Sequence, residues 1–183
     1  MIFTEVKVRG AYIVEIEQLV DERGFFARTW CLRELREQGL DSNLVQCSIS
    51  FNHKRGTLRG MHIQLPPHAE TKLVRCTQGA IYDVILDLRR DSPSYMQWHG
   101  EELTAENRNA LYVPKGCAHG FLTLADNTEV LYQISDFYAP EFARGLRWND
   151  PQFSIVWPAE VTVLSEKDQN YKEYDPATFP IIS

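Results

Sequence analysis

Residues 71–88 read TKLVRCTQGAIYDVILDL, two runs of β-forming residues on either side of Gln78-Gly79. Two such runs joined by a short turn that contains glycine are typical of paired β-strands. Similar runs recur along the chain, at residues 11–17, 44–51, 110–113 and 128–134. Many short strands separated by turns favour a sandwich or a barrel. We therefore expect an all-β fold, specifically a jelly-roll barrel with few short helices.

Helix is expected in only two short segments. Residues 31–38 place Leu32 and Leu35 on one face before a glycine that suits a helix C-terminus. The residues that follow Ser165 suit the first turn of a second helix, with the serine as its N-cap. No repeat, low-complexity tract or linker interrupts the sequence. We expect residues 1–183 to form a single domain, which is an ordinary size for one hydrophobic core.

Composition and charge narrow the classes of function. The chain has 183 residues and a net charge of −6, whereas a nucleic-acid-binding domain usually carries a basic face. No stretch reaches the roughly 20 apolar residues that a transmembrane helix needs, and the N-terminal residues lack the apolar segment of a signal peptide. The four cysteines form no C-x-x-C pair, although their spacing alone leaves disulfides open. We expect a reduced, cytoplasmic protein with no nucleic-acid or membrane partner.

A second informative stretch, residues 112–121, reads YVPKGCAHGF. Its P-x-G-x-x-H pattern resembles the second half of the cupin signature, in which the histidine, here His119, is usually a metal ligand. The H-x-H of the first half is replaced here by His62-Ile63-Gln64, and Lys72 follows near the strand that should supply an acidic ligand. Divalent ions are held by imidazoles and carboxylates, and a lysine repels them. We expect a cupin-type barrel without a metal or another cofactor.

Three side chains around these motifs suit proton transfer beside a ketone. His62 has the side chain best adapted to take up a proton near neutral pH. Lys72 carries a positive charge that stabilises an oxyanion. Strand alternation places Tyr132 on the same inward face as Val130 and Ile134, where its hydroxyl is able to donate a proton. Taken alone, however, a tyrosine in this position is more often part of the core.

Several motifs occur in a fixed order along almost the whole chain. They are DERGFF at 21–26, VQ at 45–46, GTLRGMH at 56–62, KLVR at 72–75, WNDP at 148–151 and LSEKD at 164–168. In order and spacing, the chain resembles the dTDP-4-dehydrorhamnose 3,5-epimerase family. The combination of L-R-G-x-H, K-L-V-R and P-x-G-x-x-H-G-F is specific evidence for this resemblance, whereas R-G-F-F alone is weak evidence.

This resemblance implies a catalytic role for four residues. His62 would remove the proton beside the C4 ketone of a nucleotide-diphospho-4-keto-sugar, and Asp168 would hold its imidazole in the required tautomer. Lys72 would stabilise the enolate oxygen, and Tyr132 would reprotonate the opposite face. From the residues alone, Asp168 is also explained as a helix-capping acid.

The resemblance also implies a set of substrate-binding residues. Arg59 and Arg23 would bind the diphosphate, because guanidinium groups match phosphate oxygens. In the family the residue at the position of Arg23 comes from the neighbouring subunit, so a homodimer with exchanged N-terminal strands is implied. The remaining binding residues are His119 at the sugar, Tyr138 against the base, Lys167 near the ligand, and Gln46 in the V-Q motif. Without the resemblance, Arg23 and Lys167 are ordinary surface charges.

Three departures from the family pattern fall on the nucleotide-binding residues. Arg28 stands where the family usually has Glu, Ser48 where it usually has Asn, and Ala143 where it usually has Glu. Exchanging Glu for Arg28 replaces hydrogen-bond acceptors by donors and reverses a charge. Because Arg pairs with the O6/N7 edge of guanine, a GDP-sugar is an alternative to a TDP-sugar.

Several functions remain as alternatives at this stage. The main hypothesis is epimerisation at C3, C5 or both, in deoxysugar or heptose biosynthesis for surface polysaccharide. A 3,4-ketoisomerase-like cupin and a non-catalytic cupin that binds nucleotide-sugars are the two alternatives. A metal-dependent enzyme with His68 and Glu70 as ligands is a further hypothesis. The sequence alone does not identify the sugar.

Overall fold

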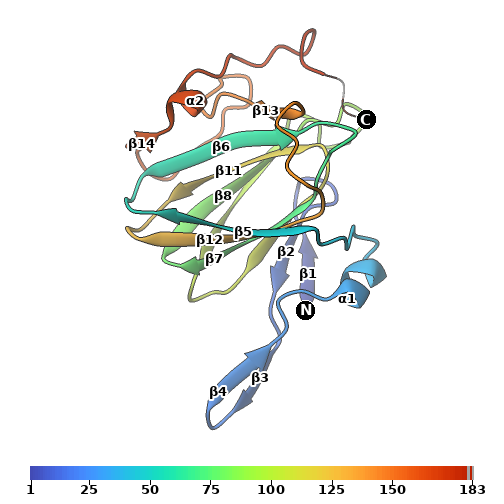
Figure 1. Cartoon of the computed structure of the whole chain (residues 1–183), viewed down its shortest axis with the longest axis vertical. Coiled ribbons are helices and arrows are strands. Elements are labelled where there is room, and N and C mark those ends of the chain that lie inside the picture. The colour runs from blue at the N-terminus through green and yellow to red at the C-terminus, as the bar shows by residue number, and fades with distance from the viewer. Residues whose placement is uncertain (181, 183) are drawn as a thin grey trace.

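The computed structural model describes residues 1–180 and 182, and within them most strands belong to two sheets that face each other. Figure 1 shows these sheets as the two walls of a jelly-roll barrel. In strand order, the first sheet consists of β1 (Ile2–Glu5), β2 (Tyr12–Glu15), β10 (Ala110–Val113), β7 (Lys72–Gln78), β12 (Thr128–Ile134) and β5 (Gln46–Asn52). The jelly-roll architecture expected from the sequence is confirmed.

The second sheet lies opposite the first. In strand order it consists of β13 (Ala143–Gly145), β6 (Thr57–Gln64), β11 (Cys117–Thr123), β8 (Ala80–Asp87) and β9 (Trp98–Thr104), and β14 (Val163–Leu164) pairs parallel to β6. A separate hairpin, β3 (Gln18–Asp21) and β4 (Gly24–Ala27), projects away from the barrel (Figure 1). The helices are α1 (Leu32–Glu37) and α2 (Glu166–Gln169).

Apolar side chains fill the space between the two sheets. Val74 and Cys76 from β7 meet Ile85 from β8, Phe121 from β11 and Val130 from β12, and all are buried. Each large apolar side chain that is fully buried contributes about 1.5–3 kcal/mol to folding. Because side chains alternate along a strand, every second residue of these strands points to this interior. The prediction that Tyr132 shares the inward face of β12 with Val130 is confirmed.

Each sheet is also covered on part of its outer face. The C-terminal segment contributes Phe153 and Tyr174, which pack against Val84 and Leu86 of β8. This double burial explains why β8 reads as an almost continuous apolar run. On the first sheet, Leu35 of α1 is buried in a separate apolar cluster.

The helix predictions were correct in place and wrong in one detail. Leu35 is buried, but Leu32 is 40% exposed, so the expected apolar face of α1 consists of one leucine rather than two. In α2, the Ser165 side chain accepts a hydrogen bond from the Asp168 backbone N–H, as expected for an N-cap. Within the described residues, no helix is long and apolar enough to cross a membrane.

Two glycines bring the strands of the site close together. A Cβ atom on Gly60 would lie 2.5 Å from the Cα of Gly120 and 3.0 Å from the carbonyl oxygen of His119, and its φ of +133° also favours glycine. This close approach joins β6 to β11 where His119 stands opposite His62. The sequence reasoning did not assign either strand, because their polar residues and glycines interrupt the alternating pattern.

Candidate active site

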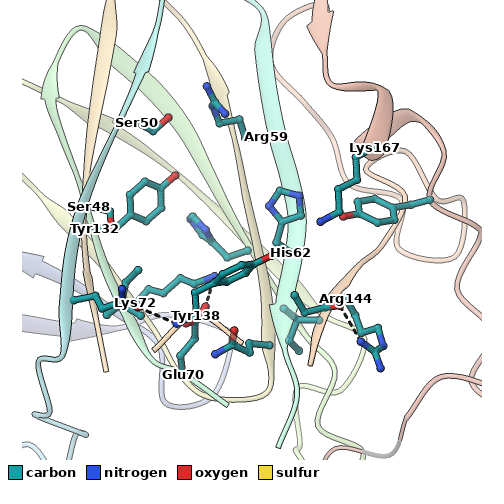
Figure 2. A pocket seen from close by; sticks show the side chains of 17 residues that line it. Ser48, Ser50, Arg59, His62, Glu70, Lys72, Tyr132, Tyr138, Arg144 and Lys167 are labelled. Atoms are coloured by element: carbon teal, nitrogen blue, oxygen red, sulfur yellow. Dashed lines mark hydrogen bonds and ion pairs between the residues drawn. The ribbon is translucent and has the colours of Figure 1, made fainter. Parts of the chain in front are cut away.

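Three of the four predicted catalytic residues line one cavity of about 450 Å³ inside the barrel, and the fourth, Asp168, lines an adjoining cavity together with His62. His62 on β6, Lys72 on β7 and Tyr132 on β12 line the first cavity, and Figure 2 shows these side chains projecting from separate strands into the same space. This cavity is also lined by most of the predicted substrate-binding residues, namely Gln46, Ser48, Arg59, His119, Tyr138 and Lys167. Since β6 and β12 belong to different sheets, His62 and Tyr132 stand on opposite walls.

His62 and Asp168 form a hydrogen-bonded pair. The Nε2 atom of His62 lies 2.7 Å from the Oδ1 atom of Asp168, which is buried. The N-cap interaction with Ser165 fixes the first turn of α2 and therefore the position of Asp168. Burial by itself would raise the pKa of Asp168, but the hydrogen bond from His62 and the electrostatic interaction with its imidazole hold that pKa below its ordinary value. A carboxylate that keeps a proton on Nε2 leaves Nδ1 as the basic atom of the ring.

A second histidine–aspartate pair lies deeper in the barrel. The Nε2 atom of His119 lies 2.7 Å from the Oδ1 atom of Asp83, and both side chains are almost fully buried. The imidazole of His119 meets the ring of Tyr132 edge to face, with centroids 6.1 Å apart. Burial, together with the negative charge of Asp83, raises the pKa of Tyr132 far above its ordinary value. Tyr132 therefore retains its proton at neutral pH, which an acid catalyst requires.

Arg59 is oriented by a residue that sequence reasoning missed. Its Nε atom donates a 2.7 Å hydrogen bond to the side-chain oxygen of Asn52, which is buried at the end of β5. Arg59, His62 and Lys167 also line an adjoining cavity of about 340 Å³. The two cavities thus share a positively charged boundary, suited to an anionic group bound beside His62. No local motif identifies Asn52, because its role depends on the pairing of β5 with β12.

Tyr171 is a further cavity residue that only the fold identifies. The ring of Tyr171 lies edge to face with His62, at 6.1 Å between centroids. Gly145 makes room for that ring, because a Cβ atom there would lie 1.9 Å from a ring carbon of Tyr171. Gln46 accepts a 2.9 Å hydrogen bond from the backbone N–H of Tyr138 and so fixes the loop that carries Tyr138.

Two predicted binding residues lie outside this cavity. Arg23, at the tip of the β3–β4 hairpin, is 84% exposed and pairs with Asp21. Arg28 pairs with Glu34 at 2.9 Å between side-chain atoms and borders a separate surface cavity. Neither residue reaches the cavity of its own chain. Their roles as substrate-binding residues remain predictions that depend on a second subunit.

The side chains at the cupin ligand positions are engaged in other interactions. His62 pairs with Asp168, and His119 pairs with Asp83. The amide of Gln64 donates to the backbone oxygens of His68 and Phe137. In residues 1–180 and 182, no group of three or more His, Cys, Asp or Glu side chains is arranged to hold a metal ion. This donor set does not fit a divalent metal.

The match to a family model decides the identity of the protein. Residues 5–175 match the model described as dTDP-4-dehydrorhamnose 3,5-epimerase, which is nearly the whole chain. The chain belongs to the dTDP-4-dehydrorhamnose 3,5-epimerase family. It is therefore an isomerase of the nucleotide-sugar epimerase type, as the motifs predicted.

Individual relatives agree with this assignment. The dTDP-4-dehydrorhamnose 3,5-epimerase of Pseudomonas aeruginosa is 42% identical over 180 residues, covering 97% of this chain and 98% of that protein. The crystal structure of the epimerase from Elizabethkingia anophelis is 37% identical, with a TM-score of 0.92 and coverage of 95% and 96%. The Bacillus anthracis epimerase, solved with TDP and pyrophosphate bound, is 41% identical, with a TM-score of 0.89 and coverage of 94% and 98%.

Proposed function

We propose that this protein epimerises a nucleotide-diphospho-4-keto-sugar at C3, C5 or both, through an enolate and without a cofactor. The observation that carries this proposal is the His62–Asp168 pair on one wall of a cavity whose opposite wall carries Tyr132. A base and an acid on opposite sides of one sugar ring are what inversion of a carbon centre requires. Membership of the epimerase family supports the same reaction in deoxysugar biosynthesis.

The proposed reaction proceeds in two proton transfers. Nδ1 of His62 removes the proton from a carbon beside the C4 ketone, and the electron pair of that C–H bond forms the enolate. The ammonium of Lys72 stabilises the negative charge on the C4 oxygen. Tyr132 then donates its proton to the opposite face of the same carbon, and solvent restores the protonation states of Tyr132 and His62. Asp168 stabilises the imidazolium that forms after the first transfer.

The diphosphate is proposed to bind at the boundary of the two cavities. Arg59 and Lys167 border both of them, and the hydrogen bond to Asn52 restrains the Arg59 guanidinium. Binding there places the sugar beside His62. The TDP and pyrophosphate bound by the Bacillus anthracis relative support a nucleoside diphosphate as the ligand class.

The alternatives differ from epimerisation in the fate of the carbon-bound protons. A non-catalytic binding protein has no use for two histidine–aspartate pairs, and it would bind the ligand without exchanging these protons. A 3,4-ketoisomerase need not use a tyrosine acid. The position of Tyr132 opposite His62 favours the epimerase.

Deuterium exchange is the experiment that tests this function. The protein is incubated in D₂O with TDP-linked and GDP-linked 4-keto-6-deoxy sugars, and NMR follows uptake at C3 and C5. Uptake at one carbon identifies a one-centre epimerase, and uptake at both identifies a two-centre epimerase. A ligand that binds without any uptake would leave a binding protein as the better explanation.

The base of the nucleotide is proposed to differ from that of a strict TDP-sugar enzyme. Ser48 and Ala143 line the cavity, at two of the positions where the chain departs from the family pattern, and Arg28 is the third. Arg144 also borders the cavity, but its guanidinium is hydrogen-bonded to the backbone of Glu141 and turned away (Figure 2). The loss of acceptors at three positions supports a base with acceptors of its own, such as guanine.

We expect the wild-type protein to bind GDP more tightly than TDP. The Arg28→Glu/Ser48→Asn double variant is expected to reverse the preference toward TDP by roughly tenfold or more, since a restored hydrogen bond to a carboxylate at position 28 is worth about 1.5–3 kcal/mol and one to a neutral amide at position 48 about 0.5–1.5 kcal/mol. Calorimetric titration of both proteins with both nucleotides measures this. A clear wild-type preference for TDP would show that the three departures leave thymine recognition intact.

We propose that the functional unit is a homodimer with exchanged N-terminal strands. The β3 and β4 strands pair only with each other among the described strands, and Leu19, Val20 and Phe26 on them are at least 70% exposed. An isolated two-stranded hairpin with such apolar exposure is marginally stable in water. Packing it on a second copy buries this surface and carries Arg23 toward the partner's cavity.

The outer face of the first sheet supports the same dimer. Arg75 lies two residues after Leu73 on β7 and so shares its outward face, and the Arg75 guanidinium is buried without a hydrogen-bond partner among the described residues. Burial lowers the pKa of Arg75 to about 10. An unpaired buried charge is unfavourable, so an acceptor from a second copy would stabilise it.

The dimer makes a specific prediction for the hairpin. The Val20→Asp variant is expected to elute as a monomer and to lose at least about tenfold in kcat/KM, because the dimer supplies Arg23 to the site. Light scattering after size-exclusion chromatography gives the mass. Val156→Asp is the matched control, since Val156 is similarly exposed but lies outside the hairpin. A monomeric wild-type protein with full activity would contradict the proposal.

We also propose that residues 1–183 act as one domain in the cytoplasm. The family model covers most of this length, and Cys31, Cys47, Cys76 and Cys117 all carry free thiols. Free thiols are expected where the compartment is reducing.

A further inference from the structure

An acidic side chain in the cavity has no part in the steps above. Glu70 lies two residues before Lys72, the first residue of β7, and its Oε1 atom is 3.1 Å from the Nζ atom of Lys72. Both side chains are only 12% exposed, and both line the main cavity. Figure 2 shows the pair at one end of that cavity, on the side away from Arg59.

The Glu70–Lys72 pair combines one negative and one positive charge. The boundary where the diphosphate is proposed to bind, in contrast, is positively charged. An isolated ammonium at Lys72 would attract any anion, including a phosphate group. The carboxylate of Glu70 cancels much of that attraction, because opposite charges at hydrogen-bond distance compensate each other at longer range. The Lys72 end of the cavity is therefore suited to a neutral, polar part of the ligand.

Each member of the pair retains hydrogen-bonding capacity. An ammonium has three donors and a carboxylate has about four acceptor positions, so one mutual interaction uses only part of either group. With Nζ and Oε1 3.1 Å apart, the pair presents a donor and an acceptor side by side. An α-hydroxy ketone presents the complementary arrangement, with a carbonyl acceptor beside a hydroxyl donor.

We propose that Glu70 and Lys72 together recognise the α-hydroxy ketone of the sugar. Lys72 donates to the C4 oxygen, and Glu70 accepts a hydrogen bond from the 3-hydroxyl. Of the two carbons that flank C4 in a hexopyranos-4-ulose, C3 carries a hydroxyl and C5 carries the ring oxygen, so only C3 supplies the donor. Glu70 is thus a specificity-determining residue, and this inference rests on the proposed function.

The test compares two substrates that differ only at C3. The wild-type protein, Glu70→Ala and Glu70→Gln are incubated in D₂O with a 4-keto-6-deoxy nucleotide-sugar and with its 3-deoxy analogue. Deuterium uptake at C5 is the common readout, because C5 is the same in both compounds. Glu106→Ala is the matched control, since Glu106 is exposed and lies outside the cavity.

We expect the wild-type protein to prefer the 3-hydroxy compound by roughly 10- to 100-fold in kcat/KM for exchange at C5, the range for a hydrogen bond to a charged group. In Glu70→Ala this preference should fall to within a few-fold of unity, and Glu70→Gln should give an intermediate value because the amide oxygen still accepts. The exchange rate of the 3-deoxy compound should change little. Circular dichroism establishes that the variants are folded.

Two results would overturn the inference. If Glu70→Ala slows exchange of both compounds equally, Glu70 acts only by holding Lys72. If the wild-type protein does not discriminate between the compounds, the 3-hydroxyl is not recognised at all. Calorimetric binding of the same two ligands gives a readout that does not depend on turnover. A protein that binds without exchange would contradict the proposed function, whereas a lost binding preference in Glu70→Ala would still support recognition by Glu70.

Discussion

The His62→Ala variant is expected to lose deuterium uptake at both C3 and C5, with kcat reduced by a factor of about 10²–10⁴. His62 is the histidine that combines access to the cavity with a buried carboxylate partner, because its side chain is 43% exposed while that of Asp168 is 5% exposed. Removing the imidazole eliminates the base for the first step at either carbon. The measurement is NMR in D₂O with the substrate that the wild-type protein prefers.

The variant must be separated from one that is merely unfolded. Leaving Asp168 buried without its partner costs about 1–3 kcal/mol, so some loss of stability is expected. Thermal unfolding and nucleoside diphosphate binding establish whether the site remains assembled. His53→Ala is the matched control, since His53 is exposed and outside the cavity. Undiminished exchange in folded His62→Ala would show that another group is the base.

The Tyr132→Phe variant is expected to separate proton exchange from inversion. His62 remains able to remove a proton and return a deuteron to the same face, so uptake with retention continues. Reprotonation of the opposite face loses its acid, so formation of the epimer should fall by about 10²–10⁴-fold. Because the pKa of Tyr132 is raised, the wild-type side chain is present as the neutral acid throughout the neutral pH range.

Two NMR quantities measure this separation, the deuterium content of the recovered substrate and the amount of the inverted product. The matched control is Tyr82→Phe, which removes the same hydroxyl from a side chain packed against Trp157, outside the cavity. Full formation of the epimer by Tyr132→Phe would exclude Tyr132 as the acid. It would then favour the ketoisomerase-like alternative, which has no need of this residue.

Some of the structure follows from short-range patterns in the sequence. The segments around residues 71–88 and 128–134 are rich enough in β-forming residues to be recognised as strands, and β12 has the expected bounds. Ser165 likewise marks the start of α2 through a local hydrogen bond. Strands β6 and β11 were missed, because Gly60 and Gly120 interrupt them. Those glycines are explained only by the contact between the two strands.

For the candidate site, the motifs in the sequence identified the catalytic and binding residues. They did not identify the side chains with which these residues form hydrogen bonds and ion pairs. It determined that the chain is an all-β member of an epimerase family, because β alternation and motif spacing are properties of nearby residues. Only the tertiary structure brought His62 to Asp168, which are 106 positions apart, and His119 to Asp83. It also revealed Asn52 beside Arg59 and the charge-balanced pair of Glu70 and Lys72. The two histidine–aspartate contacts form only when segments distant in the chain pack together, whereas the Glu70–Lys72 pair is local in sequence and only its burial in the cavity depends on the fold.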